Sequence, residues 1–427
     1  MLIVSLGFLA CIILKDPLCI FCFSFCFLLY LNERFHSKRI LIVFMTLSLF
    51  SIVLVKPCKE AEKGIYTISE IKQSYYVAKN QRTRVLVQSD LDLNFKDQIQ
   101  VDSLEPIHTD DNFTLFSFTK YNASKNVFYK TKSIRILKKS TSLKSKLYTY
   151  ISSQKNSKVL LSLYYGIHED TIDEIYTMLG YGYISAYFIV FNLLKRKYED
   201  KKIRISLLIL SILFGSFFVF TLSLTRFILY QISYLFFKSK SDQIGFTILC
   251  FSILYPTQVL SISFVLPILL QLVSYFCTEH KWIVQKMVLI SVLFIYFKKV
   301  DIVSFLLFNL LRKLYGCVFL LGMFIPDFVT LKIPSIKIHY APQFVFIFIF
   351  IVVYIQCLKH FKWKYMILFL IPFLEVFCNP FFQVYTLNIG QGDCSVIVEP
   401  FYKSVVMIDC GQSLYRDNVE RIIFPFL

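Results

Sequence analysis

Long apolar stretches separated by short polar loops occupy most of the chain. The stretches 205–237 and 244–276 are each longer than the roughly 20 residues that one membrane-spanning helix needs. Each therefore predicts two crossings. Three shorter apolar stretches open the chain, near 2–14, 17–31 and 40–55. With the four crossings of the two long stretches included, the spans predicted after residue 177 lie near 178–194, 203–220, 221–237, 244–256, 258–277, 282–298, 301–320, 343–358 and 364–378.

Two segments depart from this pattern and alternate with a period of two residues, as half-buried strands do. The first lies at about 56–155, and its roughly 100 residues are enough for one small β-rich domain or barrel. The second begins near 381. The expected strands are 64–68, 83–88, 98–101 and 133–137 in the first segment and 383–389, 395–398 and 404–409 in the second.

Composition favours a membrane environment. Hydrophobic residues make up 56% of the chain and charged residues 17%, whereas an ordinary soluble domain is roughly 45–50% apolar and about 25% charged. We therefore expect a multi-pass protein of the cell membrane. The net charge of +18 first suggests cytoplasmic loops rich in Lys and Arg, such as 33–39 and 195–202. The same charge also suits a polyanionic cargo or anionic lipid headgroups.

The C-terminal tail carries the most specific motif. Gly390, Gln391, Gly392 and Asp393 form a predicted tight turn between two apolar strands, and the third strand ends at Asp409, two residues before Gly411. This arrangement resembles the opening strands of the metallo-β-lactamase-like domain that ends ComEC proteins.

Four further segments fit the same family, and they occur along the chain in the order that the family has. Residues 171–188 resemble its polar segment and L-x-A-I-S-G-L-H-V motif: Ser185 fits, while Ala186 replaces the glycine and Phe188 the histidine. The segment 223–226 matches S-x-x-R, and 256–264 resembles the D-P and S-F-x-x-S-F elements with Tyr255 in place of the aspartate. The segment 93–101 lies where the family's OB-like barrel has a G-D-x-V strand.

The resemblance implies an α-helical polytopic membrane protein with an external β-rich, OB-like domain and a partial αβ metallo-β-lactamase-like C-terminal fragment. Its four expected parts are N-terminal transmembrane helices (1–55), the OB-like domain (56–155), a competence-type transmembrane region (156–380) and the start of the hydrolase-like domain (381–427). ComEC-like proteins bring one DNA strand into the cell during natural transformation. The resemblance therefore implies that this chain is a membrane channel that carries single-stranded DNA into the cell. Single-stranded DNA and the lipid bilayer are thus the expected partners.

The second activity of the family, degradation of the other strand, is not expected of this chain by itself. Zinc hydrolases of that fold hold metal with an H-x-H-x-D-H constellation, but no histidine follows His360. We assign no metal, no other cofactor and no catalytic residue. Either a separate hydrolase-domain chain completes the domain or the gene is a degenerate remnant. Any ATP-driven motor is expected on another protein, because no G-x-x-x-x-G-K-[ST] loop is present. The sequence is also compatible with a homo-oligomer.

Three polar residues in apolar stretches are the candidates for a DNA path. A guanidinium such as that of Arg226 is costly there unless it faces a cavity, although a short loop at 221–226 would also explain it. Ser185 and Gln271 are further candidates, but polar residues on apolar helices commonly bond a neighbouring helix. A small-solute transporter is the alternative function that the apolar pattern alone permits equally well.

Overall fold

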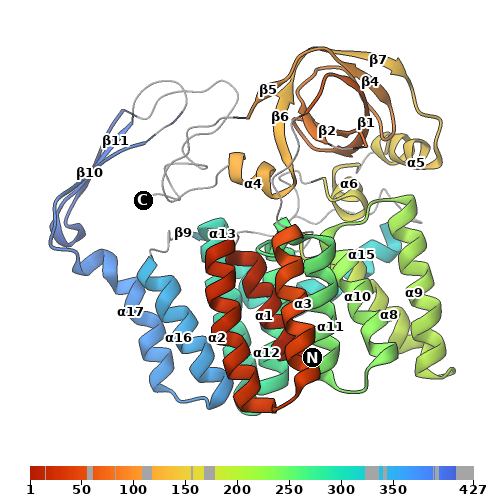
Figure 1. The fold of residues 1–427 in the computed structure, drawn as a ribbon. Coiled ribbons are helices and arrows are strands. Elements are labelled where there is room, and N and C mark those ends of the chain that lie inside the picture. The colour runs from red at the N-terminus through yellow and green to blue at the C-terminus, as the bar shows by residue number, and fades with distance from the viewer. Residues whose placement is uncertain are drawn as a thin grey trace. The chain divides into compact units, whose positions relative to one another are not determined.

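The computed structural model describes residues 1–14, 16–54, 61–81, 83–107, 118–154, 157–167, 178–322, 336–339, 344–387, 389 and 394–409. The chain forms two compact units. The first comprises Met1–Ile107, Asn122–Ile268 and Phe308–Ile333, and the second comprises His108–Tyr121, Leu269–Leu307 and Pro334–Leu427. Most of the described residues are helical, and one large sheet curls into a half-barrel (Figure 1).

The first unit opens with three helices, α1 (Leu2–Leu14), α2 (Pro17–Phe35) and α3 (Lys38–Leu54). Apolar side chains from all three pack together, with Cys11, Leu31 and Phe44 fully buried. Phe27 from α2 lies so close to Gly7 that a Cβ there would come within 2.4 Å of its ring. The sequence thus buries one face of each helix against the other two.

The large sheet contains seven strands in the order β5-β6-β3-β2-β1-β4-β7. β3 and β6 are parallel, and every other neighbouring pair in this sheet is antiparallel. A bulge shifts the β1–β2 register between Ile68 and Glu70, and such bulges increase local twist. The strands are β1 (Gly64–Ile71), β2 (Tyr76–Lys79), β3 (Arg84–Val87), β4 (Gln98–Val101), β5 (Glu105–Pro106), β6 (Val127–Thr131) and β7 (Ile134–Lys138).

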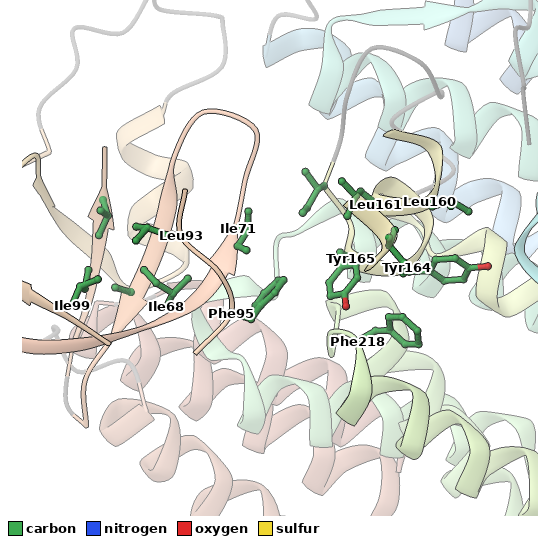
Figure 2. Packing of buried hydrophobic residues seen from close by; sticks show 14 of the residues in the cluster. Ile68, Ile71, Leu93, Phe95, Ile99, Leu160, Leu161, Tyr164, Tyr165 and Phe218 are labelled. Carbon is green, nitrogen blue, oxygen red and sulfur yellow. The ribbon is translucent and has the colours of Figure 1, made fainter. Parts of the chain in front are cut away.

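A short helix, α4 (Phe118–Ser124), precedes β6, and two helices, α5 (Leu143–Ser152) and α6 (Ser157–Tyr165), follow the sheet. The interior of the sheet continues into α6 as one hydrophobic core (Figure 2). Phe95 stacks on Tyr165 with ring centroids 5.2 Å apart, and Tyr165 in turn meets the edge of Phe218 at 5.5 Å. These aromatic contacts fix the sheet to the helices within the first unit.

Further helices of the first unit are α8 (Tyr181–Leu194), α9 (Asp200–Phe217), α10 (Leu222–Phe236), α11 (Lys240–Leu254), the 3-10 turn η1 (Pro256–Gln258) and α15 (Phe308–Gly322). Helix α12 (Ile262–Phe276) begins in this unit and ends in the second. The second unit also contains α13 (Lys281–Phe297), α14 (Ile302–Leu306), α16 (Phe344–Lys359), α17 (Lys364–Cys378) and the strand pair β8 (Lys299–Asp301) and β9 (Lys337–His339).

Helix length corrects the predicted membrane architecture. Within the described ranges, no helix is long and apolar enough to cross a membrane. The 19 residues of α2 include Glu33 and Arg34, and the 18 of α9 begin with Asp200. The other described helices have 17 residues or fewer, about 26 Å at 1.5 Å per residue against a hydrocarbon core of about 30 Å. This finding contradicts the polytopic membrane fold and the multi-pass location in the cell membrane.

The C-terminal part contains a three-stranded antiparallel sheet, β10 (Gln383–Thr386), β11 (Ser395–Val398) and β12 (Val405–Ile408). These strands lie where the alternating pattern predicts them. Leu387, Ile389, Cys394 and Val396 form their small core. The remaining turn, η3 (Pro400–Tyr402), connects β11 to β12.

Candidate nucleic-acid interface

Glu70 lies directly after the β1 bulge and is surrounded by cations. Its Oε2 atom is 3.9 Å from Lys72 Nζ and 3.8 Å from Lys125 Nζ, and its Oε1 atom is 3.7 Å from Arg84 Nη1. Arg84 begins β3, and the parallel β3–β6 pairing aligns it with Val127, two residues after Lys125. Sheet topology therefore brings together charges that are distant in the sequence.

Lys144 on α5 adds a further positive charge to this group. Its Nζ lies 4.5 Å above the Phe95 ring, a distance at which a cation is attracted to the aromatic face. Burial lowers the pKa of Lys144 to about 8, the charges of Lys96 and Lys79 lower it as well, and Glu70 opposes this effect. We call these residues the Glu70 cluster: Glu70, Lys72, Lys79, Arg84, Lys96, Lys125 and Lys144.

The cluster keeps a net positive charge at neutral pH. Burial by itself would raise the pKa of Glu70, but the charges of Lys125, Lys72 and Arg84 together outweigh it and hold this pKa below its ordinary value. Glu70 is therefore ionised and neutralises one charge among several. Burial lowers the pKa of Lys125, and Glu70 counteracts that shift. Among the residues of the Glu70 cluster, the cations therefore outnumber the single carboxylate.

A second arrangement joins the segments that carry the helical motifs. Arg226 on α10 is 4% exposed, and its Nε donates a hydrogen bond to the Ser263 carbonyl oxygen at 2.9 Å. Ser263 Oγ donates to the Met178 carbonyl oxygen at 2.8 Å. Gly180 has a φ of 70°, and a Cβ there would lie 2.6 Å from Ser223 Oγ. We call this meeting of three motif segments the motif junction.

The motif junction buries the Arg226 charge, so the guanidinium is not exposed to a ligand. Burial lowers the pKa of Arg226 to about 10, and the nearby Tyr181 phenol opposes this effect. Burial also raises the pKa of Tyr181, against the charges of Arg312 and Arg226. Arg226 thus remains a cation at neutral pH, held in the interior by its bond to a main-chain carbonyl.

The start of α10 also borders a cavity. Its volume is about 30 Å³, enough for one or two water molecules but far too small for a nucleotide. Polar lining groups come from Ser162, Thr221 and Ser223, and Gly166 and Gly180 line it as well. Thr221 Oγ accepts a hydrogen bond from the Leu224 main-chain NH at 3.2 Å and thereby caps α10. The cavity is therefore a small pocket at a helix start, lined by both polar and apolar groups.

The other predicted path residues do not meet at one place in the first unit. Ser185 is 7% exposed and packs against Gly316 of α15. Its Oγ has no hydrogen-bond partner anywhere in the described structure. Gln271 is half-buried on α12, belongs to the second unit, and its Oε1 likewise has no partner within the described ranges. Two residues differ from the family motif: Ala186, in place of its glycine, is buried, and Phe188, in place of its histidine, is 42% exposed.

The tail residues of the family motif are described only in part. Asp409 follows β12, is exposed and has a φ of 57°. Gly390, Gln391, Gly392, Asp393 and Gly411 lie outside the described residues. Among the residues that are described, no three His, Cys, Asp or Glu side chains come together as a group that could hold a metal ion.

Comparisons with protein-family models, with curated proteins and with solved structures show no match to this chain. The functional interpretation therefore depends on the chain's own residues. Glu70 and the cations that pair with it, Lys72, Arg84 and Lys125, are the part of the site that sequence reasoning missed. Basic residues at the ends of alternating stretches, such as Lys72, Lys79 and Arg84, were the available indication. Only the strand order places them around one carboxylate.

Proposed function

We propose that the chain binds single-stranded DNA at the Glu70 cluster, the partner that the resemblance to ComEC proteins implies. The observation that carries the proposal is the gathering of cations from several separate elements around one carboxylate. Proteins that bind single strands use a positively charged surface that follows the phosphate backbone. The cluster supplies such a surface on a curled sheet.

Helix α5 offers a side chain on which a base can stack. Tyr150 is 61% exposed and lies four residues after the exposed Lys146, so the two side chains share one face of the helix. An unpaired base can stack on an exposed ring while a cation contacts its phosphate. The buried rings of Phe95 and Tyr165 are closed to such stacking. This combination favours a single strand over a duplex, whose bases are already stacked.

Two local features agree with the family resemblance. Lys96 stands at the glycine position of the G-D-x-V motif and has a φ of 67°, a conformation that favours glycine. The next residue, Asp97, is fully buried and accepts hydrogen bonds from the main-chain NH groups of Asn94 at 2.9 Å and Ser140 at 2.7 Å. Both features support the alignment of this turn with the motif.

The proposal is limited to strand binding. A channel for the strand would need membrane-spanning helices, and the helix lengths contradict that part of the predicted architecture. Binding at the Glu70 cluster needs only residues of the sheet, of the segments next to its strands and of α5.

Fluorescence anisotropy of a labelled oligonucleotide with the purified full chain tests the proposal. We expect Lys144→Gln and Arg84→Gln to weaken binding, and each to reduce the slope of log K against log salt by about 0.7 for each lost phosphate contact. Lys202→Gln is the matched control, because this lysine is 75% exposed on α9 and pairs with Glu199. Equal affinity in all the folded variants, or no binding by the intact chain, would refute the proposal.

A further inference from the structure

The ion pairs of Glu70 are wider than hydrogen bonds. The three N···O distances of 3.7, 3.8 and 3.9 Å exceed the usual 2.7–3.2 Å of an N–H···O bond. The cations approach the carboxylate from three segments: the end of β1, the start of β3 and the residues before β6. The three nitrogens thus form a ring around the carboxylate oxygens that is wider than hydrogen bonds would make it.

A phosphate group suits this ring better than a carboxylate does. A DNA phosphodiester has two anionic oxygens, as a carboxylate has, but they lie farther apart on a tetrahedral phosphorus centre. They form strong charge-assisted bonds with Arg and Lys. Glu70 is also 28% exposed on its side chain, so an incoming group can reach its place. Glu70 also lies beside a bulge, where one residue leaves the regular strand pairing. The backbone there is irregular, so the Glu70 side chain can turn away from the cations.

We propose that this ring is a phosphate subsite: a DNA phosphate takes the place of the Glu70 carboxylate between Lys72, Arg84 and Lys125. Glu70 occupies the subsite in the free protein and competes with the strand. The inference deepens the proposed function and depends on it for the identity of the ligand. In the free protein the carboxylate also limits repulsion among the three cations, two of which, Lys72 and Lys125, have side chains 24% and 15% exposed.

Glu70→Gln tests this competition because it removes the charge and keeps the size of the side chain. We expect tighter binding of a labelled oligonucleotide, on the order of fivefold for one nearby repulsive charge. The slope of log K against log salt should steepen by about 0.7, since the cluster then neutralises one more phosphate charge. Glu70→Asp keeps the charge, but its shorter side chain holds the carboxylate farther from the cations. We expect its affinity to lie between those of the intact chain and Glu70→Gln.

Inorganic phosphate gives a second measurement that does not involve DNA. At matched ionic strength, phosphate should raise the melting temperature of Glu70→Gln more than chloride does, and by more than it does for the intact chain. Lys125→Gln added to Glu70→Gln should remove the difference. If Glu70→Gln does not fold, Glu70→Asp is measured in the same way, with the same direction expected.

The outcomes separate the two claims. Weaker strand binding by folded Glu70→Gln, with the intact chain binding well, would show that Glu70 positions the cations, and would overturn the competitor role while strand binding stands. A phosphate effect on the melting temperature without any strand binding would support the subsite and refute the proposed function. No phosphate effect and no tightening in either Glu70 variant would overturn the subsite.

Discussion

Arg226 Nε donates to the carbonyl oxygen of Ser263 at 2.9 Å, across 37 positions of the sequence. The bond connects α10 to the first turn of α12, and Ser263 Oγ continues it to the Met178 carbonyl. One cation therefore links two of the three segments of the motif junction, and Ser263 links the third. This role is structural in the described state, because Arg226 is almost completely buried.

Arg226→Ala should destabilise the protein. The change leaves a buried carbonyl without this donor and opens space among packed helices, and each effect typically costs about 1–3 kcal/mol. Arg226→Lys keeps the charge but lacks the planar guanidinium donor, so it should recover only part of the loss. Denaturant unfolding of the variants measures both changes, with Lys202→Ala as the exposed control. An unfolding free energy for Arg226→Ala equal to that of the control would contradict the structural role.

Gly316→Ala should also lower stability, for a steric reason. A Cβ at Gly316 would lie 2.7 Å from Ser185 Cβ and 2.9 Å from the Ala186 main-chain nitrogen. The close packing of α8 and α15 leaves no room for it, and overpacking typically costs about 1–3 kcal/mol. Thermal unfolding provides the measurement, and Ser216→Ala on the exposed face of α9 is the comparison. A melting temperature unchanged by Gly316→Ala would mean that the two helices are farther apart than described.

Strand binding should weaken as the pH rises from 7 to 9. The pKa of Lys144 is lowered to about 8, so its charge is lost over this interval and one phosphate contact with it. The slope of log K against log salt should fall by up to about 0.7. Lys144→Arg remains charged throughout and should bind equally at both pH values. Identical pH profiles for the intact chain and Lys144→Arg would exclude Lys144 from the interface.

The same lysine has the opposite effect on folding. Its pKa in the folded protein lies below the ordinary value of 10.5, so between these two values the unfolded chain binds more protons than the folded one. The contribution of Lys144 to stability therefore increases as the pH rises through this window. Comparing unfolding free energies of the intact chain and Lys144→Arg at pH 8 and pH 10 isolates this contribution.

Local patterns predicted the strands better than the long-range arrangement. Alternation placed the C-terminal strands at 383–389, 395–398 and 404–409, close to β10, β11 and β12. It also indicated β1, β3, β4 and β7. Buried and more exposed side chains alternate in β4 and in part of β1, whereas β3 has three successive buried residues and β7 has none. The parallel pairing of β3 with β6 had no local indication, since it depends on which distant strand completes the sheet.

Hydropathy predicted where many of the helices lie, but it did not predict their lengths. The apolar stretch 205–237 was interpreted as two crossings, and the structure indeed divides it, at 218–221 between α9 and α10. Hydropathy averages over such breaks and over the charged first turn of α9, so it does not fix where a helix ends. Of the candidate site, the sequence singled out Arg226 as an unusual charge. The Glu70 cluster depends on strand order and a bulge, which composition and spacing do not determine.

The end of the sheet at β7 has a consequence for association between molecules. β7 pairs with β4 on one side, and its order in the sheet leaves the other side as an edge among the described strands. Exposed edges can pair with the edge of another copy and start aggregation. Arg135 has an 82% exposed side chain, and Lys138 is exposed on the same strand. Two copies brought edge to edge would place these positive charges near one another, so the strand that closes the half-barrel also discourages its extension into a continuous intermolecular sheet.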